Sequence, residues 1–133
     1  PQMVRRPMFH FETNRPTFVN FSVNVISVPE GDQAAERLYR TTGVSDREAW
    51  LRGACGLLNA SPAAEWFQQH AKHRGAALDI SGAVLKDLPL PDLPPREWQR
   101  LAELVGKRIL LDEGSSAVAP LERAIDDLFV ISP

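Results

Sequence analysis

The stretch that decides the fold is residues 57–91, LLNASPAAEWFQQHAKHRGAALDISGAVLKDLPLP. Its opening predicts the end of one helix and the start of another, because Ser61 is a favoured N-cap residue and Pro62 suits the first helical position. The second helix is predicted to end at Gly75. It carries its apolar residues inward, and these are Ala63, Ala64, Trp66 and Phe67.

The second half of this stretch predicts short elements with firm ends. Residues 76–80 are expected to form a short strand, and residues 81–87 one or two helical turns. Residues 88–95, LPLPDLPP, must be extended, because each proline disfavours helix before it and removes a backbone donor. An edge strand and a polyproline-like run both satisfy that requirement.

Helices are predicted on both sides of this stretch. Upstream, Ser45-Asp46-Arg47-Glu48 is a capping box, and residues 50–58 supply the apolar face of the helix that follows. Downstream, residues 95–112 form the helix with the clearest amphipathic spacing. Residues 114–116, Gly-Ser-Ser, form a flexible joint before a last amphipathic helix over residues 120–130.

The first 28 residues are predicted as β structure. Apolar and polar residues alternate from Thr17 to Val28, which is typical of a strand with one buried face. A weaker strand around Phe9 precedes it, with Asn14-Arg15-Pro16 as the turn. Two neighbouring strands with a short connection predict a hairpin.

The order of these elements predicts an α+β fold, with a short β-hairpin at the N-terminus followed by a helical, bundle-like C-terminal half. The 133 residues have the size of a single domain. Its β-rich part is expected at about residues 1–28 and its helical part, with the short strand, at about residues 45–133. Because the chain begins Pro-Gln-Met and stops at Pro133, we expect a fragment of a longer protein.

Composition excludes several classes of protein. With 44% hydrophobic and 24% charged residues the chain is not of the disordered class, and no window approaches the roughly 20 apolar residues of a membrane span. Cys55 is the single cysteine and no signal peptide precedes it, which indicates a cytoplasmic protein without a membrane partner. The net charge of −2 argues mildly against a free-standing nucleic-acid binder.

Motifs for catalysis are absent from the sequence. It holds no glycine-rich phosphate loop, G-x-S-x-G, H-E-x-x-H or C-x-x-C. His70 and His73 could share a helix face as metal ligands, with Cys55 or Asp79 as a third, but a structural zinc site usually needs four ligands. In its apolar helix Cys55 is expected to be a small buried hydrophobe. We therefore predict a chain that is not itself an enzyme and holds neither metal nor cofactor.

Cationic residues gather in two places. The densest cluster is residues 70–75, HAKHRG, where basic side chains beside a flexible glycine could reach phosphates or base edges. Positive charge at a helix C-terminus is favoured in any protein, and this explains part of the cluster. The second cluster lies at the first predicted hairpin. Together they give as candidate DNA-binding residues Lys72, His73, Arg74, Arg15 and Asn14.

Several segments occur in the order of one known family. They are Leu57–Ser61, Trp66–Phe67, Arg74–Gly75, Leu78–Ile80 and Leu85–Pro91, flanked by Phe18–Val23 and Ala124–Val130. This order resembles the C-terminal specificity region of N6-adenine DNA methyltransferases, the TaqI-like and type IIG restriction–modification enzymes. That family has a helix ending in LLNS, an aromatic helix, a Gly-rich turn and then LKxLPIP.

The resemblance implies a function by position. The chain would be the target-recognition domain of a bacterial adenine-specific DNA methyltransferase or restriction–modification enzyme. It would hold double-stranded DNA for the methyltransferase domain of the same parent chain, where S-adenosylmethionine is expected to bind. The Asn/Asp-Pro-Pro-Tyr/Phe tetrapeptide of that domain does not occur here, so this fragment would have neither catalysis nor cofactor of its own.

Two alternatives remain open from the residues alone. The helix over residues 95–112, the joint at Gly114 and the acidic last helix could instead form a protein-interaction or interdomain docking module without DNA contact. The negative net charge favours that alternative. A small independent enzyme is the third possibility, but it needs a pocket with convergent polar groups, and the sequence does not assemble one.

Overall fold

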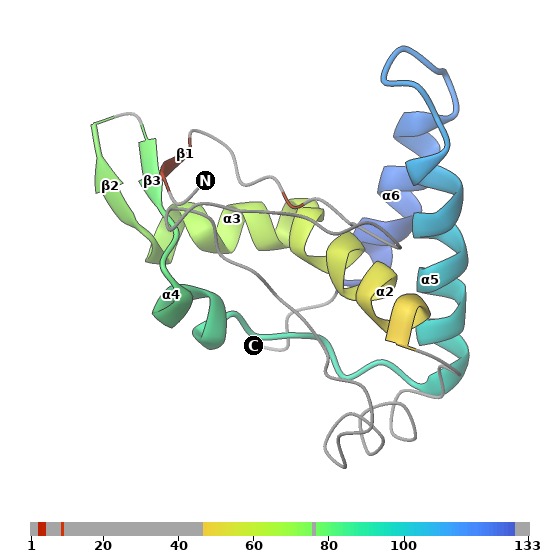
Figure 1. Cartoon of the computed structure of the whole chain (residues 1–133), viewed down its shortest axis with the longest axis horizontal. Helices are drawn as coiled ribbons and strands as arrows, with labels where there is room; N and C mark the ends of the chain where they lie inside the picture. The colour runs from red at the N-terminus through yellow and green to blue at the C-terminus, as the bar shows by residue number, and fades with distance from the viewer. Residues whose placement is uncertain (1–2, 5–8, 10–46, 76, 130–133) are drawn as a thin grey trace.

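A computed structural model describes residues 3–4, 9, 47–75 and 77–129, and it is mostly helical with one small antiparallel sheet (Figure 1). The helices in this part of the chain are α2 (Arg47–Asn59), α3 (Ser61–His70), α4 (Gly82–Asp87), α5 (Pro95–Ile109) and α6 (Val118–Leu128). The strands are β1 (Met3–Val4), β2 (Lys72–Arg74) and β3 (Ala77–Asp79).

The hairpin of the sheet, β2 and β3, lies in the middle of the sequence, whereas the sequence predicted an N-terminal hairpin; the two-residue strand β1 joins it from the N-terminus. The strand order of the sheet is β1-β3-β2, and both pairs are antiparallel. The hairpin forms at residues 72–79 because Gly75 adopts a φ of 63°, which turns the chain back on itself. The predicted N-terminal hairpin falls outside the described residues apart from Phe9, which lies in no strand.

Helix α2 crosses α5 at very short range. A Cβ added at Gly53 would lie 2.9 Å from Cζ3 of Trp98, and one added at Gly56 would overlap Cγ2 of Val105. The two glycines therefore leave room for the side chains of Trp98 and Val105 against the backbone of α2. Trp98 also stacks on Trp50 at the same crossing, with ring centroids 6.1 Å apart.

The core lies between four helices, and these are α2, α3, α5 and α6. Phe67, Leu57, Leu78 and Leu101 are its largest fully buried side chains. Figure 1 shows α5 and α6 side by side at one end of the molecule and the β2–β3 hairpin at the other, with α2 and α3 between them. Helix α6 adds Ile125 and Leu128 to the same hydrophobic cluster.

The start of α3 differs from the sequence-based expectation. Ala60, not Ser61, is the N-cap residue, and it supplies no side-chain cap. The backbone N–H of Ser61 instead donates to a carboxylate oxygen of Asp126 at 2.9 Å. A distant helix thus satisfies a donor that the sequence assigned to a local cap, and it places negative charge at the positive end of α3.

The connection from the sheet to α5 follows the predicted pattern. Ser81 caps α4 by accepting from the N–H of Val84 at 3.3 Å. The proline-rich run that follows has neither helix nor strand, and it buries Leu88 and Leu93 in the core. This extended run therefore serves as a packed strap as well as a connection.

The turn between α5 and α6 is tied by ion pairs. The guanidinium of Arg108 donates to Glu113 at 2.9 Å and to Glu122 at 3.1 Å, and the hydrogen bonds to Glu113 above all raise its pKa. The Gly-Ser-Ser segment predicted as a flexible joint is thus spanned by a bridge from one helix to the next. Among the described helices, none has the length and apolar character to cross a membrane.

Candidate nucleic-acid interface

The basic cluster of the sequence lies at the end of α3 and on strand β2. The helix stops at His70 because Ala71 has extended dihedrals (φ −74°, ψ 151°), although its N–H still donates to the carbonyl of Phe67. The next residues continue as the outer strand of the sheet, so Lys72 and His73 are exposed on an edge of the molecule. The sequence placed these residues in a helical turn, whereas the structure places them on a strand.

His73 ties the hairpin to α3. Its Nε2 lies 2.7 Å from the backbone carbonyl oxygen of Gln68, and since a carbonyl only accepts, Nε2 is the protonated nitrogen. In the register of the sheet His73 is opposite Leu78, which is fully buried. One face of β2 is therefore directed toward the helix and the core.

Lys72 occupies the opposite face of the strand. Successive side chains of a strand alternate, so the ammonium group of Lys72 is directed away from the face that carries His73. Asp79 is its partner in the register, and its side chain is half-buried. The hairpin thus presents a cation outward with one carboxylate opposite it.

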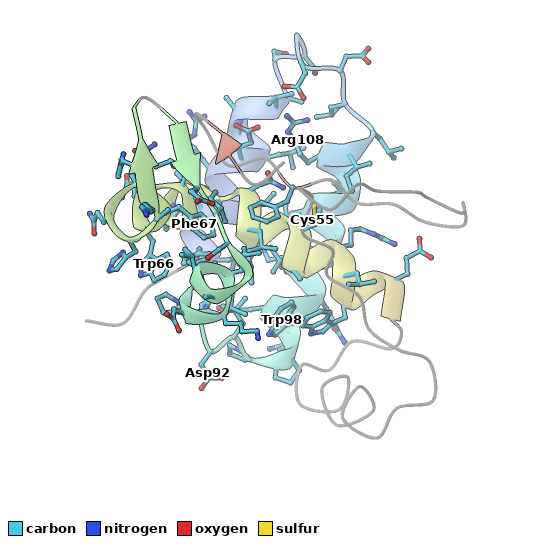
Figure 2. All side chains as sticks on the ribbon, turned by 60° about the vertical axis from the view of Figure 1, so that its left-hand side comes forward. Cys55, Trp66, Phe67, Asp92, Trp98 and Arg108 are labelled. Atoms are coloured by element: carbon cyan, nitrogen blue, oxygen red, sulfur yellow. The ribbon has the colours of Figure 1, made fainter. Side chains whose placement is uncertain are left out.

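A run of aromatic rings leads from the core to this edge. Phe9 stacks on Phe67 with centroids 6.2 Å apart, and Phe67 meets Trp66 edge-on at 5.6 Å. Trp66 then stacks on His70 with centroids 4.2 Å apart and an interplanar angle of 12°. Figure 2 shows Trp66 nearer to the margin of the molecule than Phe67.

The sequence did not predict the Trp66–His70 stack. The signal for it was present, because the two residues are four positions apart in a helix, where side chains meet. Nδ1 of His70 lies 2.9 Å from the carbonyl oxygen of Trp66, which fixes the orientation of the imidazole ring.

The five predicted DNA-binding residues have different outcomes. Lys72 and His73 lie together on β2 and are exposed. The backbone of Arg74 is in the same strand, paired with Ala77. Asn14 and Arg15 lie outside the described residues, so their place at this edge stays a prediction.

Cys55 lies in a structural setting on α2. Its Sγ is 3.6 Å from the carbonyl oxygen of Phe9, and the amide of Asn59 both accepts from the N–H and donates to the carbonyl of Phe9, each at 2.9 Å. Burial raises the pKa of the Cys55 thiol, and the hydrogen bond from Asn59 offsets part of that rise. Its thiol is therefore protonated at neutral pH.

Neither a search for metal-binding clusters nor comparison with known proteins assigns a further role to the described residues. Among the described residues no three His, Cys, Asp or Glu side chains gather as they would around a metal ion. Comparison with protein-family models, with curated proteins and with solved structures gave no match to this chain.

Proposed function

We propose that this chain is a DNA target-recognition domain of an adenine-specific DNA methyltransferase or restriction–modification enzyme. It would bind double-stranded DNA for a separate methyltransferase domain, which would bind S-adenosylmethionine and carry out the reaction. The resemblance of the sequence to that family supports the proposed function, and the exposed edge strand β2 is the proposed DNA-contact surface.

The observation that carries the proposal is the position of Lys72. It lies on the outer strand of the sheet, on the face opposite His73, and its side chain is exposed. A lysine on a projecting hairpin can approach the phosphates of a duplex without rearrangement of the core. The contact of His73 with Gln68 holds that strand against α3, so the cation is presented from a fixed support.

The test is a salt series of duplex binding by the whole chain and its variants. Each phosphate contact steepens the plot of log affinity against log salt by about 0.9. Lys72→Ala should therefore flatten that plot by about one unit, and Lys72→Ala combined with Arg74→Ala by about two units. Fluorescence anisotropy with a labelled duplex measures both slopes.

Lys107→Ala is the matched control, because Lys107 is an exposed lysine on α5. Its removal changes the net charge by the same amount at a site away from the hairpin, so the slope should stay within error of the wild type. Equal effects of Lys72→Ala and Lys107→Ala would show only a response to total charge and would reject the hairpin as a contact surface.

A specific observation also favours the docking alternative. Ile109 is 50% exposed and Leu110 is 85% exposed at the end of α5, where the Arg108 bridge holds the following turn. Large apolar side chains that are held at the surface suit an interface with another domain. Leu110→Ser would then weaken association with the remainder of the parent chain supplied as a separate protein, whereas Lys72→Ala would not.

A further inference from the structure

The exposed end of the aromatic run has the form of a base-stacking surface. Three contacts connect the rings of Phe9, Phe67, Trp66 and His70, and the run passes from a fully buried phenyl ring to an exposed imidazole. A ring that is held in this way loses little conformational freedom when a second ring stacks on it. The outer face of the His70 imidazole is thus held in one orientation, on which a planar ring could stack.

The His70 ring is fixed by two independent contacts. Trp66 covers one face at a centroid distance of 4.2 Å, and the carbonyl of Trp66 accepts from Nδ1 at 2.9 Å. Nε2 is the remaining polar atom of the ring. The solvent side of the imidazole therefore offers a flat face and one polar atom at its edge.

A cation follows this ring closely in the chain. Lys72 comes two residues after His70, and Ala71 between them is extended, so the two Cα atoms are at most about 7 Å apart. Proteins that hold unpaired nucleic-acid strands combine these elements, with cations along the backbone and aromatic side chains under the bases. This juxtaposition is compatible with a nucleotide whose base is not paired.

We propose that His70, supported by Trp66, is a stacking platform for an unpaired DNA base, while Lys72 contacts the adjoining phosphate. The inference rests on the proposed function and extends it, because it adds a site for an unstacked base to a surface for the duplex backbone. The stack supplies affinity for a base of any type, since every base has a flat aromatic face.

The test compares two short labelled duplexes, one fully paired and one with a single-nucleotide bulge, in titrations with the whole chain. Wild-type protein should prefer the bulged duplex. His70→Ala should lower affinity for it by about tenfold, within the range for one base stacked on an aromatic side chain, and leave the paired duplex unchanged. His70→Phe should keep the preference, because it keeps a ring on Trp66.

Gln69→Ala is the control, because Gln69 is an exposed neighbour on the same helix, and circular dichroism checks that each variant keeps its helices. Equal binding of both duplexes by the wild type, or an unchanged preference in His70→Ala, would overturn the platform. Loss of the preference in His70→Phe would overturn stacking as its basis. Each of these results leaves the Lys72 salt series intact, so failure of the platform is distinguishable from failure of duplex binding.

Discussion

The α2–α5 crossing and the β2–β3 hairpin are built on opposite principles. At the crossing, Gly53 and Gly56 have no side chains, so side chains of α5 pack directly on the backbone of α2, and Trp98 and Leu101 are buried there. In the hairpin, the strands have three residues each, and among their described side chains Leu78 is the buried one. One region is specified by what packs inside it, and the other by what it presents outward.

This difference indicates that substitutions at the crossing and in the hairpin should affect stability and binding separately. The crossing belongs to the core, so substitutions there should change the free energy of unfolding. The hairpin is anchored by the buried Leu78, by its pairing with β1 and by the contact of His73 with Gln68. Substitutions of its exposed residues should change ligand binding with a small effect on global unfolding.

The largest expected effect tests the core, where Phe67 is fully buried between Phe9 and Trp66. Phe67→Ala should lower the free energy of unfolding by about 3–5 kcal/mol, the usual cost of such a cavity. Urea denaturation followed by circular dichroism measures it. Gln68→Ala is the control, because Gln68 is exposed and keeps the backbone carbonyl that His73 contacts, so a change within about 0.5 kcal/mol is expected.

Gly56→Ala tests the helix crossing directly. Alanine should favour the helix by about 1 kcal/mol, but its Cβ would overlap Val105, whose branched side chain has one preferred rotamer in a helix. The net expectation is a loss of about 1–3 kcal/mol, measured by urea denaturation. Gly82→Ala, on α4 with no atom within 4 Å of the added Cβ, should stabilise slightly, and equal losses in both variants would contradict the role of close approach.

Gly75→Ala tests the hairpin as a separable region. Gly75 has open space around it, so the expected cost comes from its φ of 63° and is about 1–2 kcal/mol. Because the strain is local, it should loosen the strand that carries Lys72 and weaken duplex binding more than it lowers the urea midpoint. Gly114→Ala, a loop glycine without a positive φ, should leave both unchanged. Full duplex affinity in Gly75→Ala would show that this turn does not position the contact surface.

The sequence predicted the elements whose signals are local. The helices that became α2 and α5, the strand at residues 77–79 and the extended proline run follow from periodicity, caps and proline chemistry. Missed features depend on contacts between distant residues. Strand β2 exists because it pairs with β3, and the start of α3 is satisfied by Asp126, 65 positions away.

The candidate site shows the same limit. The sequence identified the basic residues by composition, but it could not place His73 against Gln68 and Lys72 on the opposite face, because that requires a strand at a position that looks helical. The Trp66–His70 stack was detectable from its four-residue spacing once the helix was known. The residue types in the sequence thus identified some of the candidate binding residues, whereas the pairing of β2 with β3 determines which face of the strand each side chain occupies.

The smallest expected effect concerns Cys55, at the margin of the core. Burial raises its thiol pKa above the ordinary 9.0, so as pH rises the unfolded chain releases this proton before the folded chain does. The folded state then holds more protons than the unfolded one, and stability falls with pH through the interval from the unfolded to the folded pKa, whereas below it the full contribution is present.

Comparison of the wild type with Cys55→Ala isolates this titration from those of other groups. As pH rises through 9.0 and above, the free energy of unfolding of the wild type should decline more steeply than that of the variant, with parallel behaviour at lower pH. Alkylation by a thiol reagent should also be slower than for the urea-unfolded chain, since the thiolate is the reactive form. Parallel pH profiles and equal alkylation rates would mean that the thiol is as solvated in the folded chain as in the unfolded one. Cys55 would then lie outside the buried core.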